Sequence, residues 1–328
     1  MSDGTSTLPA RAAIVGCGVI GAGWASRLHL RGVDISIADP SPAAADIFAE
    51  VTANAAEAWD ALGIATDRRG TVTFTDLDAA CADADLIVES VPERLDIKHS
   101  TLAAIDRAAP AGAIIASSTS GFTPSELAAG VDGADRLIVG HPFNPVYLLP
   151  LVEVVASPAT TDEVIERAKA WYRGIGMHPL HVRREIPAHI ADRFLEAVWR
   201  EALWLVNDGV ASTEEIDDAI RYGFGLRWAQ MGLFETYRIA GGVGGMRHFI
   251  AQFGEALSWP WTKLMDTPEL TDELIDTIAD QSDAQSGHHS IRELERIRDR
   301  NLVGFLKVLE SNEWGAGTSV GALRDLAD

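Results

Sequence analysis

The chain has 328 residues, of which 47% are hydrophobic and 23% are charged, a composition typical of a globular protein with room for two domains. The net charge of −21, from 27 basic and 48 acidic residues, argues against partners such as nucleic acid or an anionic membrane surface. The chain has two cysteines, and it shows neither a leader-like N-terminus nor a long apolar run. We therefore expect a cytoplasmic protein without disulfides or membrane spans.

The first predicted strand, Ala12–Val15, runs directly into a glycine-rich loop with the spacing G-x-G-x-x-G, and a helical pattern follows the loop. In a dinucleotide-binding loop, the first glycine allows the tight turn, the second lets the backbone approach a pyrophosphate, and the third lets the helix pack on the sheet. The start of the helix offers backbone N–H groups to the phosphates. The residues that we expect at these phosphates are Gly16, Gly18, Val19, Ile20 and Gly21.

The second predicted strand, Val33–Ala38, ends in an acidic residue, Asp39, which follows Gly21 by 18 residues. A carboxylate at this distance accepts hydrogen bonds from the adenine ribose hydroxyls. Its neighbours Pro40 and Ser41 provide no arginine for a 2′-phosphate. The predicted cofactor is therefore NAD rather than NADP, and the alternative is a tight glycine turn in another kind of α/β protein.

Strand-like and helix-like segments alternate up to about residue 185, which predicts a mostly parallel α/β sheet of the Rossmann type in a domain of residues 1–185. The predicted strands are Ala12–Val15, Val33–Ala38, Thr71–Thr75, Leu86–Glu89, Ala113–Ala116, Leu137–Gly140, Leu151–Val155 and His178–Val182. The clearest helical patterns between them are Pro42–Leu62 and Asp96–Ala108.

Helical periodicity alone follows, which predicts an all-helical domain of residues 186–328 for substrate binding and dimerisation. The predicted helices are Ala188–Asn207, Ser212–Tyr222, Ala229–Ala240, Met246–Leu257, Pro268–Asp280 and Ser290–Leu309. Ala188–Asn207 is apolar on nearly all sides, so we expect it to be buried, either inside the domain or between the subunits of a homodimer. Ser290 and Glu293 have the spacing of a capping box for the last helix.

Polar residues follow the strands in the middle of the chain. Ser120 follows one strand, His141 and Asn144 follow the next, and Glu153 lies within a third. Because the carboxyl ends of parallel strands meet at the ligand crevice, we expect these side chains near the cofactor. Free imidazole titrates near pH 6.5, so His141 is suited to take a proton from a substrate hydroxyl, with Glu153 as its orienting partner. The alternative is that His141 and Glu153 have only a structural role.

The segments 118–120, His141–Pro145 and Leu151–Val155, arranged behind the glycine loop, resemble the 3-hydroxyacyl-CoA dehydrogenase family. The resemblance covers the N-terminal domain and the start of the helical one. It implies that His141 is the catalytic base, that Glu153 pairs with it, and that Ser120 and Asn144 contact substrate and cofactor. The acid and the lysine of the family near the cofactor match Glu93 and Lys98.

The sequence departs from the family pattern where the second domain begins. The family commonly has Pro-Gly-Phe-Ile-x-Asn-Arg, whereas this chain has Pro187-Ala188-His189-Ile190-Ala191-Asp192-Arg193. Asp192 thus replaces an asparagine that helps to bind substrate, and a carboxylate there suits a cationic substrate better than an acyl-CoA. The alternative is that Asp192 only forms an ion pair with Arg193 or Arg200.

The C-terminal half narrows the resemblance to a branch of this family that oxidises the 3-hydroxyl of L-carnitine. Gly225–Arg238, Asp280–Ser290 and the insert Tyr147–Pro150 resemble that branch. L-Carnitine carries a quaternary ammonium, which aromatic faces and a nearby carboxylate bind best. The residues that we expect at the substrate are Phe143, Ile190, Asp192, Phe224 and Trp228.

Two other functions also fit the sequence. One is another short-substrate dehydrogenase, of the L-gulonate or 3-hydroxybutyryl type, although a CoA thioester would need basic groups that this acidic chain lacks. The other is a non-catalytic NAD-binding protein, against which the intact Ser120, His141, Asn144 and Glu153 argue. We expect no metal, because the pair His288 and His289 is more typical of a surface helix start.

Overall fold

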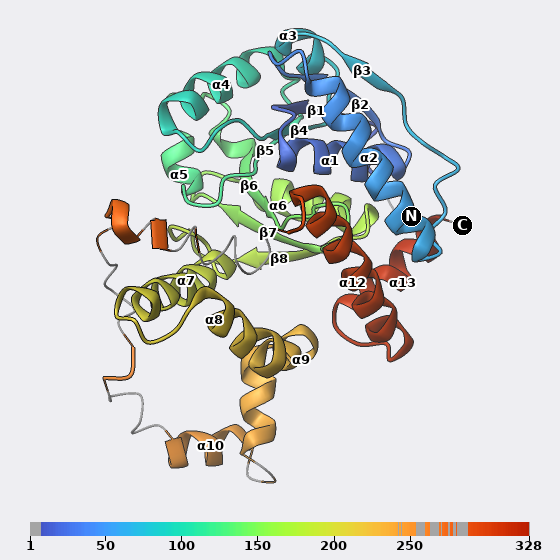
Figure 1. Ribbon diagram of the computed structural model, residues 1–328. Helices are drawn as coiled ribbons and strands as arrows, with labels where there is room; N and C mark the ends of the chain where they lie inside the picture. The colour runs from blue at the N-terminus through green and yellow to red at the C-terminus, as the bar shows by residue number, and fades with distance from the viewer. Residues whose placement is uncertain are drawn as a thin grey trace. The chain divides into compact units, whose positions relative to one another are not determined.

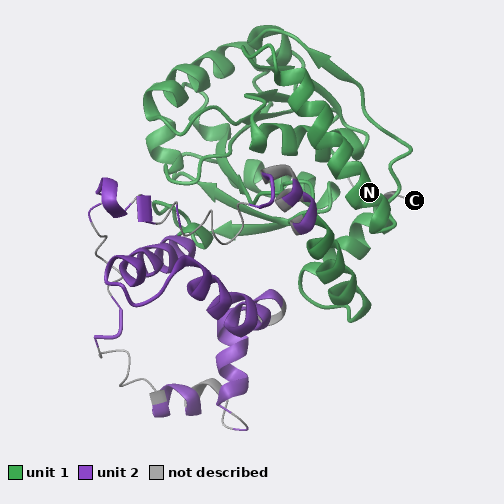
Figure 2. Cartoon of the chain, viewed as in Figure 1, with its two compact units in different colours: residues 1–192, 299–328 green, residues 193–298 purple. Residues whose placement is uncertain are grey.

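In the computed structural model the chain forms two compact units, which are described separately (Figure 2). Unit 1 consists of residues 1–192 and 299–328, and unit 2 consists of residues 193–298. The structure describes residues 8–241, 243, 245–253, 260–262, 269, 271–274, 276, 277, 280 and 288–327. Among these residues, no helix combines the length and the apolar character needed to cross a lipid bilayer.

Unit 1 is built on an eight-stranded sheet with the order β3-β2-β1-β4-β5-β6-β7-β8 (Figure 1). The strands are β1 (Arg11–Val15), β2 (Asp34–Ala38), β3 (Val72–Phe74), β4 (Leu86–Glu89), β5 (Ile114–Ser117), β6 (Leu137–Pro142), β7 (Leu151–Ala156) and β8 (His178–Val182). Neighbouring strands are parallel except for β6 and β7, which are antiparallel. The predicted mostly parallel α/β sheet is therefore confirmed. The strand order reverses direction at β1 and β4, the position where ligands bind in such sheets.

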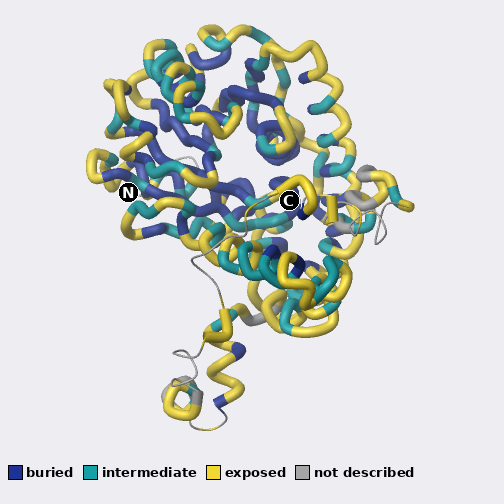
Figure 3. The backbone as a smooth tube through the Cα atoms, turned by 60° about the vertical axis from the view of Figure 1, so that its left-hand side comes forward, coloured by how far each residue is buried: buried dark blue, intermediate teal, exposed yellow. Residues whose placement is uncertain are grey.

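Both faces of the sheet are covered by helices. Ala12 and Ile14 of β1 pack into one hydrophobic core, and their neighbours Ala13 and Val15 pack into another. The helices that contribute to the first core are α1 (Val19–Leu30), α2 (Ala44–Ala61) and α6 (Asp162–Gly174); those that contribute to the second are α3 (Leu77–Cys81), α4 (Leu95–Ala108) and α5 (Pro124–Leu127). Burial on both sides explains why the strands are continuous apolar runs (Figure 3).

The last two helices, α12 (Ile291–Ser311) and α13 (Ala316–Ala327), bring the end of the chain back to unit 1. Leu306 and Leu323 share a third hydrophobic core with Trp59 of α2. We predict a domain boundary near residue 185, whereas the compact units divide the chain differently, because these helices pack against α2. The capping box is confirmed, since Glu293 N–H donates to Ser290 Oγ at 3.3 Å and Ser290 N–H donates to the Glu293 carboxylate at 2.7 Å.

The described residues of unit 2 form helices and the turns between them. Its elements are α7 (Ala191–Asn207), the π-helical turn η2 (Ile220–Phe224), α8 (Thr213–Ala219), α9 (Gly225–Ala240) and α10 (Gly245–Phe253). The part of the predicted helix Met246–Leu257 beyond Phe253, and most of Pro268–Asp280, lie outside the described residues.

Helix α7 differs from its prediction in two ways. It begins three residues late, because Ala188 and His189 adopt left-handed backbone conformations. Its apolar side chains are also less buried within the chain than we expected. Leu203 and Val206 are buried, but Phe194 and Trp199 are 56% and 54% exposed. Burial of α7 between subunits stays a prediction.

Candidate active site

The turn from β1 into α1 requires glycine at two of the three glycine positions of the motif, Gly16 and Gly21. Gly16 has φ +92°, and a Cβ there would lie 2.7 Å from the Ser90 carbonyl oxygen. A Cβ at Gly21 would overlap the carbonyl oxygen of Gly16. At Gly18, in contrast, no atom of the described residues lies within 4 Å of the position that a Cβ would take. The backbone at Gly18 is thus open to a close approach by a ligand, as a pyrophosphate requires.

Asp39, at the end of β2, fixes the same loop from the other side. Its Oδ2 accepts a hydrogen bond from Cys17 N–H at 2.6 Å, and its Oδ1 accepts one from Ser41 N–H at 2.7 Å. Gly18 is the N-cap of α1 and provides no side-chain cap, so the amides of the first turn at Val19 and Ile20 retain donor capacity. A carboxylate and a helix N-terminus therefore lie side by side, in the arrangement that a ribose and a pyrophosphate require.

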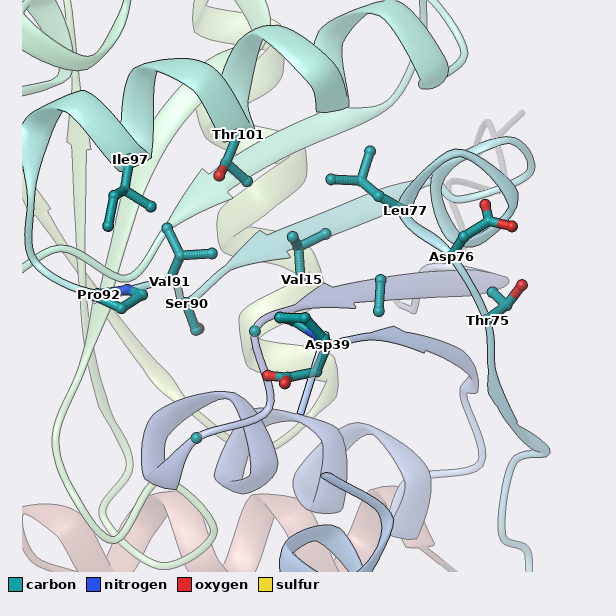
Figure 4. Close-up of a pocket in the computed structure, with 14 residues that line it drawn as sticks. Val15, Asp39, Thr75, Asp76, Leu77, Ser90, Val91, Pro92, Ile97 and Thr101 are labelled. Carbon is teal, nitrogen blue, oxygen red and sulfur yellow. The ribbon is translucent and has the colours of Figure 1, made fainter. Parts of the chain in front are cut away.

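A cavity of about 780 Å³ extends from this loop over the carboxyl ends of the central strands (Figure 4). It is lined by Val15, Gly16, Gly18, Ala38, Asp39, Pro40, Thr75, Asp76, Leu77, Ser90, Val91, Pro92, Ile97 and Thr101. Leu77 and Ile97 form apolar walls beyond Asp39 (Figure 4). The open backbone at Gly18, the carboxylate of Asp39 and the apolar end of the cavity fit the phosphates, the ribose and the base of NAD.

A buried ion-pair network lies beside this cavity. Lys98 on α4 is 1% exposed, and its Nζ lies 3.0 Å from Glu89 Oε1 and 3.2 Å from Glu93 Oε2. A buried charge needs such partners, because desolvation without them is costly. Ser117 Oγ–H also donates to Glu89 at 2.5 Å. The sequence pointed to Glu93 and Lys98 but not to Glu89 or Ser117, because an acid and a serine at strand ends carry no distinctive signal.

Glu93 connects this network to the loop that carries Ser120. Its Oε1 accepts hydrogen bonds from Thr119 Oγ–H at 2.5 Å and from Gly121 N–H at 3.0 Å. Burial raises the pKa of Glu93, but the Thr119 hydrogen bond and the Lys98 charge outweigh burial, so its pKa lies below the ordinary value. The carboxylate is therefore ionised at neutral pH and holds both ends of the loop.

His141 lies directly opposite Glu153 in the antiparallel ladder of β6 and β7. Its Nδ1 lies 3.0 Å from Glu153 Oε2, and its Nε2 lies 3.1 Å from Ser120 Oγ. Both His141 and Glu153 are buried. The structure thus brings together three of the predicted catalytic residues, from two neighbouring strands and the loop after β5.

The second carboxylate oxygen of Glu153 is bonded to the start of α7. Its Oε1 accepts hydrogen bonds from Ile190 N–H at 2.9 Å and Ala191 N–H at 3.1 Å. Burial raises the pKa of Glu153, but the hydrogen bonds from His141 and these two amides together lower it below the ordinary value. Because Glu153 is ionised, His141 Nδ1 carries the proton that it donates, and Nε2 of the neutral ring is an acceptor.

Asp192 lies on the side of the His141 ring away from Glu153. Its Oδ2 lies 3.5 Å from His141 Nε2, on the same side as Ser120. The ion pair that the structure shows for Arg200 is with Glu196, at 3.9 Å. The geometry places the carboxylate of Asp192 beside the nitrogen of His141 that faces Ser120.

The other predicted substrate and cofactor residues are less closely grouped. The Phe143 ring lies 5.1 Å from the His141 ring, edge to face, whereas Asn144 is exposed. Ile190 is 38% exposed and contacts Glu153 through its backbone. Phe224 and Trp228 belong to unit 2, where their ring centroids lie 4.6 Å apart. The roles of all of these residues in substrate binding stay predictions.

Comparison with protein families finds matches over most of the chain. Residues 11–186 match the model described as 3-hydroxyacyl-CoA dehydrogenase, NAD binding domain. Residues 189–279 match the model described as 3-hydroxyacyl-CoA dehydrogenase, C-terminal domain. The first match lies on the sheet of unit 1 and confirms NAD as the predicted cofactor.

Two curated relatives are similar over nearly the whole chain. An L-carnitine dehydrogenase/betainyl-CoA thioesterase from Ruegeria pomeroyi is 62% identical over 93% of this chain, and the chain spans only 63% of the length of that relative. An L-carnitine dehydrogenase from Mesorhizobium japonicum is 56% identical over 95% of this chain and 87% of its own length.

Solved structures are also similar to this chain, and one of them covers nearly all of it. It is that of 5-formyl-3-hydroxy-2-methylpyridine 4-carboxylic acid 5-dehydrogenase, an NAD⁺-dependent dismutase. It is 29% identical to this chain with a TM-score of 0.76, and the similarity covers 92% of this chain and 98% of the other.

Proposed function

This chain belongs to the 3-hydroxyacyl-CoA dehydrogenase family, and from that membership we propose that it oxidises the 3-hydroxyl of L-carnitine to 3-dehydrocarnitine with NAD. The observation that carries the proposal is the set of contacts of the His141 ring. One ring nitrogen bonds to Glu153, and the other faces Ser120 and Asp192. The two relatives named for L-carnitine support this choice of substrate.

In the proposed reaction His141 is the general base. Its Nε2 takes the proton of the 3-hydroxyl, while its Nδ1–H remains bonded to Glu153, which stabilises the imidazolium that forms. Ser120 Oγ lies within hydrogen-bond distance of Nε2 and holds the hydroxyl in line. When it is bound, NAD supplies the hydride acceptor. Gly16, Gly18, Gly21 and Asp39 would hold it, with Asn144 near the nicotinamide.

Substrate charge is the second part of the proposal. The trimethylammonium group of L-carnitine cannot donate a hydrogen bond, so aromatic faces and a carboxylate are the groups that can bind it. Asp192 and Phe143 both lie next to His141 and supply one of each. We propose that these two residues, with Ile190, distinguish L-carnitine from 3-hydroxy acids that carry no ammonium group.

The experiment is a panel of hydroxy compounds, each incubated with the purified protein and NAD and followed by NADH absorbance. We expect NADH from L-carnitine, and far less from L-gulonate or 3-hydroxybutyryl-CoA. His141→Asn should lower kcat by about 10²- to 10⁴-fold, the usual contribution of a general base, and should leave the Kd of NAD unchanged. If L-carnitine yields no NADH, the substrate assignment is wrong, and a His141→Asn variant with normal kcat would exclude His141 as the base.

A further inference from the structure

The turn that enters α7 is strained, and it contains a second histidine. Ala188 has φ +60° and His189 has φ +48°, although neither is glycine. The left-handed region is unfavourable for residues with a Cβ, and it persists only where the surroundings impose it. Here Ala188 N–H donates to Gly121 O at 3.1 Å and His189 N–H donates to Ile186 O at 3.2 Å. The turn is therefore tied to the loop that follows Ser120.

The ring of His189 is fully buried and has a defined protonation state. It is 0% exposed, and its Nε2 lies 3.2 Å from the carbonyl oxygen of Thr119. A carbonyl oxygen only accepts hydrogen bonds, so Nε2 carries a proton. The other nitrogen, Nδ1, is buried and has no hydrogen-bond partner among the residues that the structure describes. A cationic ring would place a second N–H there without an acceptor, so the ring is neutral.

His189 lies next to the proposed catalytic base and to the loop that carries Ser120. Its ring centroid is 5.3 Å from that of His141. Thr119, whose carbonyl it binds, directly precedes Ser120 in the chain. The two residues that follow His189 donate their amides to Glu153. One turn therefore bonds directly to Glu153, and to the backbone on both sides of Ser120 through Thr119 and Gly121.

We propose that His189 is a positioning residue that holds the Ser120 loop against His141 through a neutral imidazole. The Nε2–H bond to Thr119 fixes the backbone next to Ser120, and the neutral ring adds no positive charge beside a histidine that becomes protonated in each turnover. This inference rests on the proposed function where it gives His141 the role of the base. The protonation state of His189 does not depend on that function.

The charges around the ring act in both directions. Burial lowers the pKa of His189, and the nearby His141 lowers it further, whereas the hydrogen bond to Thr119 and the carboxylates of Glu153 and Asp192 raise it. The net direction is below the ordinary histidine value. The ring therefore stays neutral at a pH where an exposed histidine would be charged.

Two substitutions separate positioning from simple filling of space. His189→Gln keeps an N–H donor at the distance of Nε2, whereas His189→Leu fills the volume without a donor. We expect kcat of His189→Leu to fall by about ten- to a hundredfold, the effect of a misplaced catalytic group, and His189→Gln to retain kcat within about threefold of wild type. KM for NAD should change in neither. His29→Leu is the matched control, because His29 also has a buried Nδ1 without a partner in the described chain, and it should retain wild-type kcat.

A measurement on the wild-type protein without substrate tests the proposal if the variants fold poorly. ¹⁵N NMR of labelled histidine should show one ring that is neutral, protonated at Nε2 and unchanged by titration down to the lowest pH at which the protein stays folded. A cationic or Nδ1-protonated His189 at neutral pH would overturn the proposal. So would a His189→Leu variant that keeps wild-type kcat, or a His189→Gln variant as impaired as His189→Leu. The NMR result does not depend on the substrate, so it separates failure of this inference from failure of the proposed function.

Discussion

At the scale of single residues, the two neighbouring buried histidines, His141 and His189, differ in the groups that their ring nitrogens face. His141 Nδ1 faces the carboxylate of Glu153, whose charge stabilises a protonated ring. Among the described residues, His189 Nε2 has the carbonyl of Thr119 as its partner, and burial favours its neutral form. In the proposed reaction, a base that gains and loses a proton therefore lies next to a hydrogen-bond donor that stays neutral. The chemistry of each ring follows from its partner and not from residue type alone.

The first prediction concerns Glu153→Gln. Glutamine removes the charge that stabilises the imidazolium, so we expect kcat to fall by about 10- to 100-fold and the acid limb of the kcat/KM profile to move to lower pH. The pKa of Glu153 is depressed in the folded protein, so its contribution to stability is present above the ordinary glutamate pKa of about 4.3 and is lost as pH falls through the folded value. Glu153→Gln should therefore lose less stability on acidification than wild type. A variant with the wild-type pH–rate profile would contradict this role.

At the scale of elements, the glycines of the motif between β1 and α1 are required for different reasons. Gly21 is required by the protein itself, because a Cβ there would overlap the Gly16 carbonyl oxygen. Gly18 has an ordinary φ of −74° and open space beside it, so the fold alone does not require glycine there. We propose that the need for glycine at position 18 comes from a ligand that approaches its backbone.

The second prediction uses these two glycines as a matched pair. Gly18→Ala should keep the wild-type Tm and raise the Kd of NAD by about tenfold or more, equivalent to about 1.4 kcal/mol, because the methyl group occupies the approach to the phosphates. Gly21→Ala should lower Tm as well, because the loop must shift. Thermal unfolding and NAD titration measure both effects. Equal NAD affinity in Gly18→Ala and wild type would remove the loop from the cofactor site.

The elements also show what the sequence could predict. All eight strands lie within a few residues of their predicted positions, because apolar runs buried on both faces have a strong pattern. The predicted start of α7 was wrong by three residues. Ala188 and His189 adopt left-handed backbone conformations, but neither is a glycine, so the sequence gives no sign of this turn. Glu89, a single acid at the end of an apolar strand, is recognisable as the partner of Lys98 only in three dimensions.

At the scale of the whole molecule, the ends of the chain belong to one unit. The core that joins α2 to α12 and α13 contains Trp59, Leu306 and Leu323. Trp59 Nε1–H also donates to Tyr147 O at 2.7 Å, and Tyr147 O–H donates to Asp299 at 2.5 Å. The insert after His141 is thus held by residues from both halves of the sequence. No local pattern predicts such contacts, because they depend on how distant helices return to the sheet.

The third prediction tests this long-range packing. Leu306 is 3% exposed, so Leu306→Ala should destabilise unit 1 by about 2–5 kcal/mol, the usual cost of a large cavity in a core. Phe305, its neighbour on α12, is 47% exposed, and Phe305→Ala should have a much smaller effect. Denaturant unfolding followed by the tryptophan fluorescence reports the difference. Equal destabilisation by the two variants would show that α12 does not pack on α2 as described.

Oxidation of a 3-hydroxy acid that carries a quaternary ammonium is tested by one ratio of specificity constants. It is kcat/KM for L-carnitine divided by kcat/KM for 3-hydroxybutyrate, which has the same hydroxyl and carboxylate but no ammonium, measured by NADH formation in wild type and in Asp192→Asn. We expect a ratio well above one in wild type and a fall of about tenfold or more in Asp192→Asn, since tenfold corresponds to about 1.4 kcal/mol of lost charge interaction. A wild-type ratio near one, or no NADH from L-carnitine, would contradict it.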